Sequence, residues 1–79
     1  MTKYYVGYLQ DNDEYVYVAS IDNANVKVLT IKEGAIGFDK VELAESLLKV
    51  AKSIVANRDY VVLEITTEIK EVSNNEWIF

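Results

Sequence analysis

The stretch that most constrains the fold of this chain is a single helix-like segment, residues 38–57. Apolar residues recur there at the spacing of one helical face, and the opposite face carries acidic, basic and hydroxyl side chains. Asp39 and Glu42 have the spacing of a capping box, so we expect a helix over about residues 39–56. Because the segments on both sides have β-strand character, this helix must cover a sheet.

Four segments rich in aromatic and β-branched residues are predicted to form strands, and polar breaks separate them. The expected strands occupy about residues 3–9, 14–19, 26–31 and 60–71, and a C-terminal tail follows at 73–79. The order β-β-β-α-β predicts an α+β fold, a two-layer sandwich in which the helix covers one face of a mixed four-stranded sheet. Short connections favour the strand order 4-1-2-3, and we expect the last strand to run parallel to the first and third. Residues 1–79 are predicted to form a single domain.

Composition excludes several classes of function. The chain has neither cysteine nor histidine, so it offers no disulfide, no structural zinc site and no serine–histidine triad. Its net charge of −5 disfavours nucleic acid as a partner. No apolar run has the length of a signal peptide or a membrane span, so we expect a cytoplasmic protein without membrane contact. We identify no catalytic residues, no metal ligands and no cofactor site, and predict that the chain is not an enzyme.

Tyrosine is the most distinctive residue type, with six copies in 79 residues. If Val16, Val18 and Leu63 face the helix, the period of two gathers aromatic and apolar residues on the other face of the sheet. The residues predicted for this face are Tyr4, Tyr8, Tyr15, Tyr17, Tyr60 and Val62. Three interpretations stay open: tyrosines that stiffen the sheet, a protein interface including self-association, and a platform for stacking bases. The acidic surroundings disfavour base stacking, which normally accompanies a cationic groove.

The chain closes on a second apolar group, which contains Trp77, Ile78 and Phe79. Large apolar side chains at a polar chain end need a surface to pack on. This surface is either the chain's own sheet or helix, or a partner. A core this small gains most from further buried aromatic area, which favours packing on the chain itself.

Three stretches of the sequence together resemble a known group of proteins. These are the opening residues 3–8, the helix start with Phe38, Asp39, Glu42, Ala44 and Glu45, and the strand 60–67. The chain is similar in these stretches to small uncharacterised proteins encoded by phages and prophages of low-GC Gram-positive bacteria. The resemblance covers structural elements and transfers no catalytic residue. It implies an intracellular accessory factor that acts by binding host or phage proteins.

The hypothesis that these observations favour is a non-enzymatic protein-binding module that forms a homodimer through its tyrosine-bearing sheet face. The candidate interface then includes that face together with Trp77 and Phe79. A host or phage protein is the other partner that we consider. The alternative hypothesis is an acidic inhibitor that occupies the nucleic-acid site of a host processing or defence enzyme, which the charge of −5 would suit.

Overall fold

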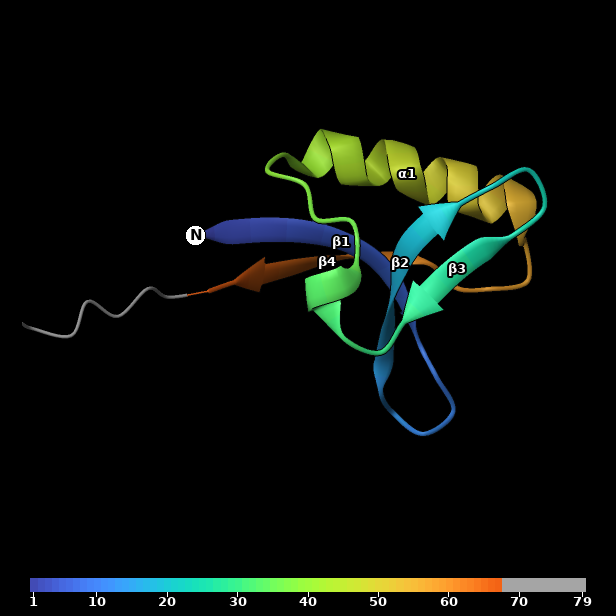
Figure 1. The fold of residues 1–79 in the computed structure, drawn as a ribbon, viewed down its shortest axis with the longest axis horizontal. Helices are drawn as coiled ribbons and strands as arrows, with labels where there is room; N and C mark the ends of the chain where they lie inside the picture. Colours follow the sequence, from blue (N-terminus) through green and yellow to red (C-terminus); the bar gives the residue numbers. More distant parts are fainter. Residues whose placement is uncertain (68–79) are drawn as a thin grey trace, which may run out of the picture.

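Residues 1–67 are described by the computed structural model, and they form a sheet with a helix on one side (Figure 1). The elements in chain order are β1 (Thr2–Leu9), β2 (Tyr15–Ile21), β3 (Val26–Leu29), the short 3-10 helix η1 (Lys32–Gly34), α1 (Val41–Ile54) and β4 (Val61–Thr66). The strand order is β3-β2-β1-β4. The α+β class and the predicted order 4-1-2-3 are therefore confirmed. The predicted end of the last strand beyond residue 67 and the tail at 73–79 lie outside the described residues.

The direction of the last strand differs from the prediction. β4 pairs with β1 antiparallel, from Thr2 opposite Thr66 to Gly7 opposite Val61, so the described sheet is antiparallel throughout. The prediction of a mixed sheet was wrong. It assumed that the helix carries the chain back along the sheet, so that the last strand would run parallel to the first. The connection between β3 and α1 makes that return instead. α1 then runs in the direction of β1, and β4 comes back antiparallel to it (Figure 1).

This connection also fills a gap between the two central strands. β1 and β2 pair at three positions, from Gly7 opposite Tyr17 to Leu9 opposite Tyr15. Beyond them the backbone of Phe38 pairs with Tyr4, through hydrogen bonds of 2.8 and 2.9 Å. The amide of Ile36 donates to the carbonyl of Val18 at 3.1 Å. Residues 36–38 therefore satisfy backbone groups that the diverging strands would leave without partners.

The helix begins two residues later than predicted and without the expected capping box. α1 begins at Val41 with Lys40 at the N-cap, and no side chain caps it. Asp39 instead accepts a hydrogen bond from Lys3 Nζ at 2.7 Å, an ion pair across the start of β1. The pairing of Phe38 with Tyr4 places Asp39 beside Lys3 and so draws its carboxylate away from the helix.

This ion pair gives an acid-dependent contribution to stability. The hydrogen bond from Lys3 lowers the pKa of Asp39 below its ordinary value of 3.8. A depressed folded-state pKa stabilises the protein above the unfolded pKa, and this contribution is lost as the pH falls through the folded value. We expect Asp39→Asn to lower the Tm at about pH 6 and to have a shrinking effect toward about pH 2. Thermal unfolding of both proteins across this range tests it, and a pH-independent difference would contradict it.

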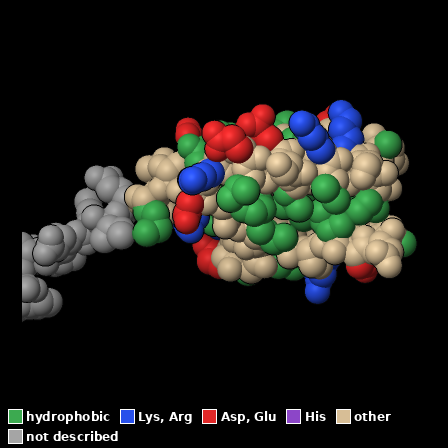
Figure 2. All heavy atoms as spheres, turned by 90° about the horizontal axis from the view of Figure 1, so that it is seen from above, with side chains coloured by type: hydrophobic (Ala, Val, Ile, Leu, Met, Phe, Trp, Pro, Cys, Tyr) green, Lys and Arg blue, Asp and Glu red, His purple; other side chains and the backbone are tan. Residues whose placement is uncertain are grey.

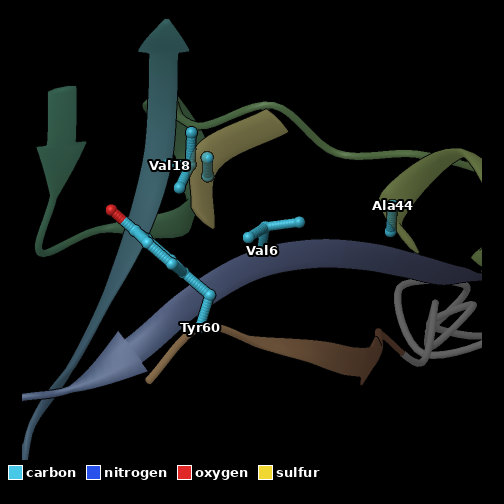
Figure 3. Close-up of a cluster of buried hydrophobic side chains, with 5 residues drawn as sticks. Val6, Val18, Ala44 and Tyr60 are labelled. Carbon is cyan, nitrogen blue, oxygen red and sulfur yellow. The ribbon is translucent and has the colours of Figure 1, made fainter. Parts of the chain in front are cut away.

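The core lies between α1 and the central strands. Val6, Val16 and Val18 are fully buried, and Val6 and Val18 cluster with Ala44 and Ala51 of α1. Figure 3 shows Tyr60 extending from the start of β4 toward this group. The two alanines are small, so the tyrosine rings that surround them fill the space between helix and sheet.

Candidate functional site

The candidate site is the side of the sheet that faces away from α1, which we call the open sheet face. Val6, Val16 and Val18 point toward the helix, so their neighbours along each strand point to the other side. The open sheet face consists of Tyr5, Leu9, Tyr15, Tyr17, Leu29, Val61, Leu63 and Ile65. Leu9 is 51% exposed, and Tyr15 and Val61 are also exposed. A contiguous apolar surface of this kind usually marks an interaction site.

Two tyrosines form the aromatic centre of this face. The rings of Tyr5 and Tyr17 meet edge to face, with centroids 5.8 Å apart at 70°. Gly37 lies against the Tyr5 ring, where a Cβ would come to 3.0 Å from Cε2. Both rings are half-buried. The contact between the two rings and the contact of Tyr5 with Gly37 therefore fix the ring positions within a single copy of the chain.

Lys32 lies close enough to this aromatic pair to interact with both tyrosines. Its Nζ donates to Glu33 at 2.9 Å, and this hydrogen bond raises the pKa of Lys32 above 10.5. Interaction with Tyr5 and Tyr17 raises it further, although less. The same ion pair lowers the pKa of Glu33. The charges at this edge of the open sheet face thus neutralise each other.

The structure divides the tyrosines that the sequence placed together. Tyr15 and Tyr17 lie on the open sheet face, as predicted. Tyr4, Tyr8 and Val62 pack against the core instead, and Tyr60 is 7% exposed. Their predicted position on the open face was therefore wrong, and Trp77 and Phe79 lie outside the described residues.

The error has a physical cause. On β1 and β4 both alternating sets of side chains are apolar, so a period of two cannot decide which set faces the helix. The small Ala44 and Ala51 decide it, because they leave room that large rings fill. Tyr5, Leu9, Val61, Leu63 and Ile65 consequently take the outer positions, and the sequence-based interpretation missed them.

The displaced tyrosines have structural contacts. The rings of Tyr8 and Tyr60 meet edge to face at 5.6 Å, and the Arg58 guanidinium lies 5.0 Å from the centroid of Tyr8. The Tyr4 hydroxyl donates to Glu64 Oε1 at 3.1 Å, and this bond is the main cause of the raised pKa of Tyr4. These contacts join β1 to β4 and to the residues just before β4.

A second apolar surface lies on the helix side. Figure 2 shows hydrophobic side chains along the middle of this face and charged side chains along one edge. Leu43 and Val50 of α1 are 50% and 48% exposed. In α1 the side chains of Ala44 and Ala51 alone are buried, so the sheet covers a narrower strip of the helix than its apolar arc.

Other kinds of site were sought in the described part of the chain. Residues 1–67 contain no cluster of three or more potential metal-ligating side chains and enclose no pocket. Over the same residues, no helix combines the length and the apolar character needed to cross a membrane. Comparison of the chain with protein-family models, with curated proteins and with solved structures finds no match.

Proposed function

We propose that this chain is a non-enzymatic protein-binding module that acts in the cytoplasm and self-associates through the open sheet face. The observation that carries this proposal is the apolar side of the sheet opposite α1, on which Leu9, Tyr15 and Val61 are exposed. Tyr15 and Tyr17 add large contact area and a hydrogen-bonding tip at a low entropic cost. The phage-type accessory role implied by the resemblance is part of the proposal.

A second copy is the partner that suits this face best. Two sheets pack face to face at about 10 Å when their facing side chains are apolar, as in a β-sandwich. The open sheet face presents such a surface, with the Lys32–Glu33 pair at one edge. A partner that binds through its own charge would need an unpaired counter-charge there. An apolar surface, such as the same face of another copy, needs none.

The test is a comparison of two leucines with nearly equal exposure. Leu9 lies on the open sheet face and is 51% exposed, whereas Leu43 lies on α1 and is 50% exposed. We expect Leu9→Ser to weaken self-association at least about tenfold, because burial of a leucine contributes roughly 1.5–3 kcal/mol. Leu43→Ser removes the same side chain elsewhere and is the control. Sedimentation velocity over a concentration series measures both.

Two outcomes would contradict this proposal. One is a wild-type protein that stays monomeric at about 100 μM. At this concentration a dimer with a free energy of association stronger than about −5.5 kcal/mol would be detected. The other is an equal effect of both serine substitutions, which would show that self-association does not use the open sheet face. Tyr15→Ser and Tyr17→Ser extend the test across the face.

A further inference from the structure

The second feature that the structure leaves without a partner is the outer edge of β4. Within residues 1–67, β4 is an end strand and pairs only with β1. Met1 and Thr67 exchange both backbone hydrogen bonds, at 2.7 and 2.8 Å. In an antiparallel ladder such pairs alternate, so residues 61, 63 and 65 also bond to β1. The backbone groups of Val62, Glu64 and Thr66 therefore point away from it.

The two edges of this sheet differ in their protection against pairing. β3, at the other edge, has four residues, contains Lys27 and borders a bulge between Val18 and Ser20. Short length, lysine and bulges are the devices by which proteins block strand addition. β4 has six residues in an unbroken register, with neither lysine nor proline. Among the described residues nothing pairs with its outer edge, so another strand can add there.

We propose that two copies of this chain pair through their β4 strands, antiparallel, to form one continuous eight-stranded sheet. This pairing uses backbone groups of β4 and does not depend on whether the open sheet face binds a partner. A contact between identical edges is two-fold symmetric, and two-fold symmetry makes the strands antiparallel. The side chains of β4 favour a second copy as the partner.

Side chains select the register of this pairing. With Leu63 on the two-fold axis, Leu63 faces its own copy and Val61 faces Ile65 of the partner subunit. This arrangement continues the apolar surface of the open sheet face across the junction. A shift that placed Glu64 on the axis would bring two carboxylates directly opposite each other, which is unfavourable. The charge of Glu64 thus disfavours the register in which Glu64 lies on the axis.

Amide hydrogen exchange on the full chain tests the pairing without any substitution. The amides of Leu63 and Ile65 bond to β1 in a single copy and are expected to be protected at every concentration. The amides of Val62, Glu64 and Thr66 gain partners only in the dimer, so their protection should rise with protein concentration. Protection of these three that is equally strong in dilute protein, or absent at all concentrations, would overturn the proposal.

A pair of substitutions at one position provides the second test. Glu64→Pro removes an outward N–H without breaking a bond to β1, and the symmetry removes it twice. We expect it to weaken dimerisation about tenfold or more compared with Glu64→Ala, which keeps the N–H. Circular dichroism confirms that both variants are folded, and if the proline variant unfolds the exchange experiment decides. Equal dimerisation of the two folded variants would overturn the proposal.

The two proposed contacts can be separated. Leu9→Ser removes a side chain from the open sheet face and leaves the β4 edge intact, so edge-paired dimers should persist in that variant. Glu64→Pro leaves the open sheet face intact. If the amides of Val62, Glu64 and Thr66 keep their concentration-dependent protection in Leu9→Ser, the edge pairing is supported even if the open sheet face binds no partner.

Discussion

Gly7→Ala is expected to destabilise the protein by about 3 kcal/mol, a large share of the stability of so small a chain. Gly7 lies where β1 meets β2, and a Cβ built on it would overlap the carbonyl oxygen of Val16. That oxygen belongs to the backbone, so the overlap is relieved only if the two strands separate. The β1–β2 ladder has pairs at three positions, and its loss would leave only the bridge through residues 36–38 between the two halves of the sheet.

Gly34→Ala is the matched control for this substitution. A Cβ at Gly34 would come to 2.8 Å from Cδ1 of Leu29, which is the end of a side chain and can rotate away. Alanine also reduces the entropy of the unfolded chain, so we expect a change within about 1 kcal/mol. Urea unfolding of both variants measures the difference. Similar losses at both glycines would show that the close approach of β1 and β2 does not hold in solution.

The features that the sequence predicts well are those that local patterns encode. The helix, the strands and their order follow from periodicity, polar breaks and short connections. Val16 and Val18 were expected to face the helix, and both are buried. These predictions need no knowledge of how distant residues meet.

The features that the sequence misses depend on contacts between distant segments. The backbone pairing of Phe38 with Tyr4 returns the chain along the sheet, and this reverses the expected direction of β4. It also places Asp39 beside Lys3, which removes the expected helix cap. No local sequence pattern predicts a single backbone bridge between two residues more than thirty positions apart in the chain.

The composition of the candidate site illustrates the same limit. On β2 the alternation of valine and tyrosine gave the correct face for Tyr15 and Tyr17. On β1 and β4 apolar residues occupy both faces, and the choice depends on the alanines that the helix presents. The position of Gly7 is a usable sign, because a residue without a side chain often marks a close approach of two backbones.

Tyr60→Ala is the substitution that most directly tests which face of β4 is buried. Tyr60 is 7% exposed, belongs to the core and meets the Tyr8 ring edge to face. Removing the ring leaves a cavity beside Val6 and Val18, and we expect a loss of about 3–5 kcal/mol. Tyr15→Ala removes the same ring from the open sheet face, where it is 42% exposed, and should cost less than about 1 kcal/mol.

Urea unfolding of the two alanine variants gives the comparison, at a protein concentration low enough for both to be monomeric. A large difference places Tyr60 in the core and Tyr15 outside it. If both tyrosines faced away from the helix, as the sequence suggested, the two losses would be small and similar. Tyr60→Phe keeps the ring, and because Tyr60 donates no hydrogen bond to a partner within the described residues it should cost little near neutral pH.

Alkaline pH provides an independent measure of the same burial. Burial is the main cause that raises the pKa of Tyr60 above its ordinary value of 10.0. The folded state therefore keeps its phenolic proton at a pH where the unfolded chain has lost it. The contribution of this proton to stability is complete below about pH 10 and is lost as the pH rises toward the folded-state pKa. We expect the wild type to lose stability as the pH rises above about 10, and Tyr60→Phe to lose less. Parallel losses in the two proteins would place the Tyr60 hydroxyl in water and contradict the packing of β4 against α1.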